Sequence, residues 1–166
     1  AASSLQVRFI GYTGDEINNA GKGFLIDNIQ VSCNSGTLYQ QDFTGSLGDM
    51  TAVNDALTTN QWGYDSTIAP NVARWGNPGL NNYGTTNGTD YLDTPAINMT
   101  ACSSSFSVKF DFLINYEEGL NVDRGMVDVT IDGGRPTRIA DGTGKALGNL
   151  VNDNAWHTCV CYDSNG

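Results

Sequence analysis

An alternation of apolar and polar residues with a period of two recurs along this 166-residue chain and constrains its fold more than any other feature. It is cleanest over residues 106–114, where every second residue is large and apolar and the polar residues Ser107, Lys109 and Asp111 lie between them. This period is typical of a half-buried β-strand. Because no long amphipathic helix pattern occurs, the sequence predicts an all-β fold. Comparable strand patterns occupy residues 5–9, 24–31, 39–43, 127–131 and 156–162.

Turn-forming residues separate these segments. The chain contains 20 glycines, and Asp132-Gly133-Gly134 has the composition of a hairpin turn. Residues 45–89 are rich in Gly, Asn and aromatic side chains and show no clear period, although residues 49–57 are expected to form one or two helical turns. A chain of this length can bury the core of one domain. We therefore predict a two-sheet antiparallel jelly-roll sandwich with a long aromatic, Gly- and Asn-rich loop region.

The formal net charge of −10 limits the partners of this chain. Nucleic acid and anionic membrane surfaces both require a basic patch, so neither is expected as a partner. No apolar run approaches the length of a membrane-spanning helix, and no membrane insertion is expected. No signal-peptide pattern is present, so we expect a mature or excised segment. The surplus of carboxylates suits a soluble extracellular protein that binds calcium, or one that acidity merely keeps soluble.

Four cysteines, Cys33, Cys102, Cys159 and Cys161, indicate disulfide chemistry. Zinc is not expected because there is no CxxC pair and His157 is the only histidine. Cys33 ends one strand pattern and Cys102 precedes another, which favours a bond between them if those strands are neighbours. Cys159 and Cys161 could bond to each other, bond separately to the other two, or stay free. Disulfides in turn predict an extracellular or cell-surface location.

No set of catalytic residues stands out, so we predict that the protein is not an enzyme. His157 has no serine motif near it and is expected to be structural. Asp111, Glu117 and Glu118 are the best carboxylates for glycoside hydrolysis, but the two glutamates lie in a segment typical of a solvated loop. Two sequons, at Asn87 and Asn98, predict N-glycosylation in a eukaryotic source.

Several motifs in a fixed order resemble the extracellular family of concanavalin-like jelly rolls, which includes MAM-type domains and carbohydrate-binding modules. They are spread along the chain from Leu5 to Thr158. The motifs are Gln41-Asp42-Phe43, Tyr91 to Asn98, Phe106 to Phe112, Val127 to Gly134, Trp156-His157-Thr158, Leu5 to Phe9 and Ile26 to Ile29.

The order of these motifs departs from the family, because the two motifs that would close the jelly roll come first. The chain therefore divides into a closing-strand segment, residues 1–36, with strands at about 5–10 and 24–32, and a main body, residues 37–166. It resembles a circular permutant, one period of a tandem array, or a subunit that donates its closing strands to a neighbour. An unclosed head-to-tail exchange of strands would propagate into a filament.

From this order we predict a non-enzymatic extracellular structural module, a repeat or subunit of a surface filament or adhesive fibre assembled by β-strand complementation. Its partners would be further copies of itself, as a homo-oligomer or polymer, with glycans as a further class. In related jelly rolls a structural calcium ion ties the opening strand to the closing strand, and the resemblance implies Asp42 and Asp27 for that role. Asp65, Asp90 and Asp93 are weaker additions.

The resemblance also implies an alternative function, that of a carbohydrate-binding module in a secreted protein. Such a module stacks exposed aromatic rings on sugars, and the long loop region offers Trp62, Tyr64, Trp75 and Tyr83. The same aromatics could instead pack the loop onto the sandwich. A third interpretation is a MAM-type cell-adhesion domain within a larger receptor.

Overall fold

The protein is a sandwich of two β-sheets, as seen in a computed structural model that describes residues 2–14, 21–54, 61–77, 87–103, 105–116, 123–142 and 148–163. Within these ranges there are thirteen strands, and no helix is long and apolar enough to cross a membrane. The strands are β1 (Ser4–Thr13), β2 (Gly23–Cys33), β3 (Gly36–Gln41), β4 (Thr51–Val53), β5 (Trp62–Asp65), β6 (Val72–Trp75), β7 (Gly88–Asp93), β8 (Ile97–Asn98), β9 (Phe106–Asn115), β10 (Asp123–Ile131), β11 (Thr137–Asp141), β12 (Gly148–Asn149) and β13 (Trp156–Asp163).

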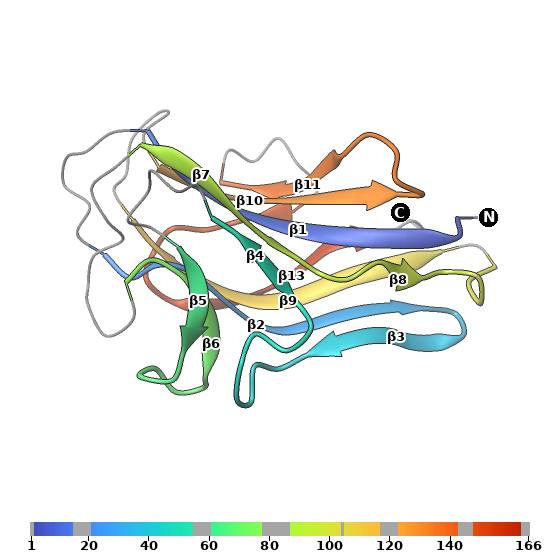
Figure 1. Cartoon of the computed structure of the whole chain (residues 1–166), viewed down its shortest axis with the longest axis horizontal. Helices are drawn as coiled ribbons and strands as arrows, with labels where there is room; N and C mark the ends of the chain where they lie inside the picture. Colours follow the sequence, from blue (N-terminus) through green and yellow to red (C-terminus); the bar gives the residue numbers. More distant parts are fainter. Residues whose placement is uncertain are drawn as a thin grey trace.

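One sheet has seven strands in the order β12-β11-β10-β1-β7-β4, with β8 also paired to β1. The other has six strands in the order β13-β9-β2-β6-β5, with β3 also paired to β2. Every named pair is antiparallel except β11 with β12. Figure 1 shows the two layers, with β1 running beside β10 in one sheet and β2 beside β3 in the other. The predicted all-β two-sheet sandwich is confirmed.

The two strands predicted to close the sandwich lie in the middle of the two sheets. β1 pairs with β10 on one side and with β7 and β8 on the other, with Val7 opposite Val129. β2 pairs with β9 on one side and with β6 and β3 on the other, with Ile26 opposite Phe112. All of these partners belong to the same chain. β1 and β2 therefore each supply a central strand to one layer of the sandwich.

The core lies between the sheets and is formed by the inward residues of the alternating strands. Phe110 of β9 makes an edge-to-face contact with Phe9 of β1, with ring centroids 5.0 Å apart, so the core joins the two sheets directly. The largest side chains with less than 2% exposure are those of Trp75, Arg74, Phe9, Phe24, Phe43, Phe110, Phe112, Leu5, Leu25, Ile26 and Ile29.

The long loop region contains more regular structure than its sequence predicts. β4, β5, β6 and the first part of β7 all lie within residues 45–89. The expectation of helical turns over residues 49–57 is wrong for Thr51–Val53, which form an edge strand against β7. Each of these strands is too short to show a period, and pairing with a longer neighbour decides its conformation.

The hairpin turn predicted at Asp132-Gly133 is present and also anchors the start of β1. Both residues have positive φ, 51° and 66°, and the Gly134 amide donates to the Ile131 carbonyl at 2.8 Å, as in a type I′ turn. The Asp132 carboxylate accepts hydrogen bonds at 2.7–2.8 Å from the amides of Ser3 and Ser4 and from the Ser3 hydroxyl. These bonds lower the pKa of Asp132. The turn thus fixes the end of a strand that lies 129 residues away in sequence.

Candidate functional site

A groove of about 280 Å³ lies on the six-stranded sheet. We call it the outer groove. Residues of β2, β9 and β13 and of the segment between β5 and β6 line the outer groove. The segment between β5 and β6 contains the cis peptide Ala69-Pro70. Its lining residues are Asp27, Asn28, Pro70, Asp111, Trp156, His157 and Thr158.

Strand register places two rows of side chains across this sheet. Trp156 of β13 lies opposite Leu113 of β9, which in turn lies opposite Leu25 of β2. Residues directly opposite in an antiparallel pair share a face, so these three form an apolar row. Leu25 and Leu113 pack with Val72 and Ile68 in a small cluster separate from the main core.

The second row is polar and lies beside the first. Thr158 is opposite Asp111, and Asp111 is opposite Asp27. The Thr158 hydroxyl donates to Asp111 Oδ1 at 2.5 Å, and Asn28 Nδ2 donates to Asp111 Oδ2 at 2.8 Å. Asn28 reaches this position because β2 has a bulge between Asp27 and Gln30, where Asn28 adopts a left-handed φ of 49°. The Asp111 carboxylate is thereby fixed in orientation.

Asp27 is the least satisfied charged group of the outer groove. It is only 2% exposed, and among the described residues the Asn28 amide, at 2.8 Å, is the group that donates to it. Burial raises the pKa of Asp27, the hydrogen bond from the Asn28 amide opposes this, and the charges of Asp111 and Asp42 raise it further. A buried carboxylate normally has several partners. Asp27 therefore retains an oxygen that can accept a ligand's donor.

The predicted calcium pair, Asp27 and Asp42, lies close enough for the charge of Asp42 to act on Asp27. Within the described ranges, no group of three or more His, Cys, Asp or Glu side chains is placed to hold a metal ion. The weaker candidates are engaged elsewhere: Asp93 with Arg8 at 2.6 Å, Asp65 with the buried Arg74 at 3.0 Å, and Asp90 with the Trp75 indole at 3.0 Å. Calcium stays a prediction that depends on Asp27 and Asp42.

His157 is held by neighbours within the fold. Its Nε2 lies 2.9 and 3.0 Å from the two carboxylate oxygens of Asp153, and its ring centroid lies 5.5 Å from that of Phe112. The hydrogen bond with His157 lowers the pKa of Asp153. In this arrangement His157 braces the start of β13 and forms one side of the outer groove.

The aromatics predicted for sugar stacking belong mostly to the core. Trp62 and Trp75 are 3% and 0% exposed, and their indoles donate to the Asp90 carbonyl at 3.2 Å and to its carboxylate at 3.0 Å. Buried rings cannot stack on a sugar at the surface, so packing describes both tryptophans better. Tyr64 is half-buried. Tyr83, like Glu117 and Glu118, lies outside the described residues.

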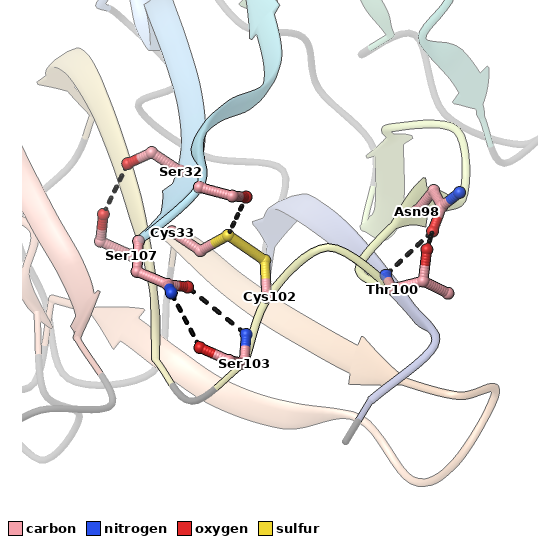
Figure 2. The surroundings of a disulfide bond; sticks show 9 residues. Ser32, Cys33, Asn98, Thr100, Cys102, Ser103 and Ser107 are labelled. Carbon is pink, nitrogen blue, oxygen red and sulfur yellow. Dashed lines mark hydrogen bonds between the residues drawn. A yellow bond between two sulfur atoms is a disulfide. The ribbon is translucent and has the colours of Figure 1, made fainter.

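Both pairs of cysteines form disulfides, which confirms the predicted disulfide chemistry. Cys33 at the end of β2 bonds to Cys102 before β9, with their Cα atoms 5.8 Å apart (Figure 2). Cys159 bonds to Cys161 within β13, with Cα atoms 5.1 Å apart. Alternate Cα atoms of a regular strand are about 6.6 Å apart. The irregularity between Val160 and Tyr162 brings this second pair closer.

The two sequon asparagines are both exposed. The Oδ1 atom of Asn98 accepts hydrogen bonds from the Thr100 amide at 2.9 Å and the Thr100 hydroxyl at 2.7 Å, so the sequon forms a local turn beside the Cys33–Cys102 disulfide (Figure 2). Asn87 immediately precedes β7. Glycosylation of either residue stays a prediction.

Sequence reasoning missed the outer groove itself. The sequence patterns place Trp156 and Asn28 in strand motifs and indicate no binding role for them or for Pro70. The available signal was the alternation in β13, which places Trp156, Thr158 and Val160 on one face. The three are exposed, whereas Cys159 and Cys161 on the other face are buried.

The fold and the outer groove together define a disulfide-linked, all-β sandwich module with a strongly acidic composition. Comparison with models of protein families gives no match, and comparisons with curated proteins and with solved structures give no significant one.

Proposed function

We propose that this chain is a non-enzymatic extracellular structural module, a repeat or subunit of a surface filament or adhesive fibre in which neighbouring copies complement one another's sandwiches with residues 1–36. The observation that carries the proposal is the central position of β1 and β2 in the two sheets. Without them, β10 and β7 lose their common neighbour, and so do β9 and β6. A copy that lacks these strands must obtain them from elsewhere.

The apolar surface that β1 and β2 bury supports the proposal. Seven of their large apolar side chains, those of Leu5, Val7, Phe9, Phe24, Ile26, Ile29 and Val31, are no more than 1% exposed. At about 1.5–3 kcal/mol for each buried side chain, they contribute roughly 10–20 kcal/mol. If a neighbouring copy supplies them, the same free energy holds the two subunits together. A filament built in this way would dissociate only when its subunits unfold.

The connection between β2 and β3 is a suitable hinge for such an exchange. Only Asn34 and Ser35, both exposed, separate the two strands. Short hinge loops favour domain swapping because the chain relieves the tight turn by extending. Two disulfides support an extracellular setting. The carbohydrate-binding alternative receives no support from Trp62 and Trp75, which are buried.

The Cys33–Cys102 disulfide provides the test, because it joins the exchanged segment to the main body. Equal amounts of ¹⁴N- and ¹⁵N-labelled chain are co-refolded under oxidising conditions, and the disulfide-linked peptides are weighed by mass spectrometry. Exchange between copies is expected to give about half of the Cys33–Cys102 peptides with one light and one heavy strand. The Cys159–Cys161 bond, whose partners are two residues apart, serves as the control and should stay unmixed.

Imaging of the same material completes the test. We expect negative-stain images to show fibres. A Gly-Gly insertion after Asn34, which relaxes the hinge, should reduce their number. Exclusively unmixed Cys33–Cys102 peptides together with globular particles at high concentration would show that each copy closes on itself, and the proposal would be abandoned.

A further inference from the structure

We propose that the outer face of the seven-stranded sheet binds a second copy of this chain, and that the two copies pack face to face about a two-fold axis that runs parallel to the strands between β1 and β10. We call this surface the ladder face. The outward side chains of β4, β7, β1, β10 and β11 form it, and Figure 1 shows β7, β1 and β10 in one layer. Strand exchange uses the hydrogen-bonding edges of β1 and β2 instead, so the two contacts are independent.

A row of alternating charge crosses the ladder face. Strand register places Arg8 of β1 between Asp93 of β7 and Asp128 of β10. Asp128 in turn lies opposite Arg138 of β11. Arg8 donates two hydrogen bonds to the Asp93 carboxylate at 2.6–2.7 Å, and Arg138 pairs with Asp128. The charges along the row therefore read minus, plus, minus, plus, and contacts within the chain hold them in place.

This order of charges matches a second copy in one orientation. A two-fold axis parallel to the strands, between β1 and β10, reverses the row in the second copy. Arg8 then faces Asp128 of the second copy, and Asp93 faces its Arg138. An axis along the row would place every charge against the same charge, which is unfavourable. The favoured axis also passes through the middle of the strand order β12-β11-β10-β1-β7-β4, so the two faces overlap across their whole width.

The next two rows along the strands match in the same orientation. Ile10 of β1 lies opposite Tyr91 of β7 and Met126 of β10, which makes this row apolar. Ile10 would face Met126 of the second copy. In the following row Tyr12 lies opposite Arg124, so each would face the other residue type, an aromatic ring against a guanidinium group. Three consecutive rows thus fit the same two-fold axis.

The ladder face is neutral, although the chain is strongly acidic. Its described outward charges are three arginines and three aspartates, namely Arg8, Arg124, Arg138, Asp93, Asp128 and Asp141. The whole chain has 8 Lys and Arg against 18 Asp and Glu. Long-range repulsion between two copies is therefore weakest where these faces meet. A partner that carries charge of only one sign would find no comparable match.

The size of the ladder face predicts a weak and reversible contact. Five strand spacings of about 4.8 Å, and the rise of β1 from Gln6 to Tyr12, give a surface of roughly 24 by 20 Å. This is about 500 Å² on each copy and about 1,000 Å² in total, the lower limit for a specific interface. We expect a dissociation constant on the order of 100 µM.

The test follows energy transfer between two separately prepared pools of wild-type chain. One pool carries a donor dye and the other an acceptor dye at the N-terminal amine, attached after refolding and oxidation. The Cys33–Cys102 disulfide then fixes any strand exchange within each pool, so copies from different pools can meet only through a surface. At about 150 mM salt and about 500 µM protein, transfer should appear on mixing and disappear after about hundredfold dilution.

Charge reversal on the two sides of the axis identifies the surface. Arg8→Glu places a carboxylate against Asp128 of the second copy, and Asp128→Lys places an ammonium group against its Arg8, each twice in the dimer. Each variant alone should associate at least tenfold more weakly than the wild type. Mixed with each other, the two variants restore opposite charges at both contacts and should recover to within about threefold of the wild type.

Lys109→Glu is the matched control, because it makes the same change of charge at an exposed position in β9 of the other sheet. It should associate as the wild type does. Melting curves of the separate variants show whether they are folded. Should Arg8→Glu not fold, Met126→Glu replaces it and places a carboxylate against Ile10 of the second copy.

Three results would overturn the proposal. The first is the absence of transfer between wild-type pools at about 500 µM. The second is wild-type association in a folded charge variant or in Met126→Glu. The third is a mixture of the two charge variants that associates no better than either alone. None of these results depends on the mixing of Cys33–Cys102 peptides, so a failure of this interface can be told from a failure of strand exchange.

Discussion

Replacement of Gly11 by alanine is expected to be among the most damaging single-methyl changes in this protein. An added Cβ at position 11 would lie 2.5 Å from Cε2 of the Trp75 indole and closer still to Cδ2 and Cγ. Ordinary contacts begin at 3.4 Å, so the indole would have to retreat by about 1 Å or more. It has no free space to enter, because Trp75 is fully buried and its Nε1 donates to the Asp90 carboxylate at 3.0 Å.

Two contributions determine how much Gly11→Ala lowers the free energy of unfolding. Overpacking of a close-packed core costs about 1–3 kcal/mol, and loss of a hydrogen bond to a charged group costs about 1.5–3 kcal/mol. We therefore expect Gly11→Ala to lower the free energy of unfolding by about 3–5 kcal/mol. For a domain of this size the melting temperature would fall by about 6–20 °C. Urea denaturation followed by tryptophan fluorescence measures the first quantity, and calorimetry measures the second.

A matched control is available in Gly63. This residue also lies in a strand, and an added Cβ there would meet no atom within 4 Å. Gly63→Ala should change stability by no more than about 0.5 kcal/mol. Adding Trp75→Leu to Gly11→Ala should cost less than the sum of the two single changes, because the smaller side chain makes room for the methyl group. If Gly11→Ala lies within about 1 kcal/mol of the wild type, the packing described around Trp75 is refuted.

Asp27→Asn should raise the melting temperature at neutral pH in chelator by about 2–6 °C, because it removes a buried, poorly satisfied charge. Because the pKa of Asp27 is raised in the folded protein, the wild type should lose stability as the pH rises through that raised pKa. Calorimetry from about pH 4 to 7 should show a smaller loss of stability in Asp27→Asn. An equal loss in both proteins would contradict the raised pKa of Asp27. If calcium binds there, it should raise the melting temperature of the wild type but not of this variant. Loss of the Cys33–Cys102 bond in a double serine variant should cost about 4 kcal/mol in urea denaturation, because the bond spans 69 residues, against about 1–2 kcal/mol for Cys159–Cys161. Equal costs would exclude the chain-entropy explanation.

The long strands could be predicted from sequence because their signal is local. The alternation over residues 106–114 defines β9 to within one residue, and the glycine chemistry of Asp132-Gly133 defines the turn after β10. The short strands could not be predicted in the same way. β4 and β6 have three and four residues, no more than two periods of the alternation, and their conformation depends on pairing with β7 and β2.

The outer groove could not be predicted from the sequence, for a different reason. Asp27 and Asp111 are 84 positions apart in sequence and become neighbours through the register of β2 with β9. A single-residue shift of that register would move one of them to the opposite face. The left-handed conformation of Asn28 sets the bulge, and no pattern in the sequence marks it. The burial of Trp62 and Trp75 likewise depends on Asp90, which satisfies both indoles from another sheet.

The central position of β1 and β2 also determines the order in which the sandwich can fold. These strands leave the ribosome first, but β9 and β10, against which they lie, follow roughly a hundred residues later. Contacts between residues so far apart in sequence form slowly. Until β9 and β10 are synthesised, the backbone groups of β1 and β2 lack their strand partners. In that interval these two strands can pair with strands of other nascent copies. The rate of synthesis relative to the local concentration of copies would therefore influence whether β1 and β2 pair within their own chain or with another copy.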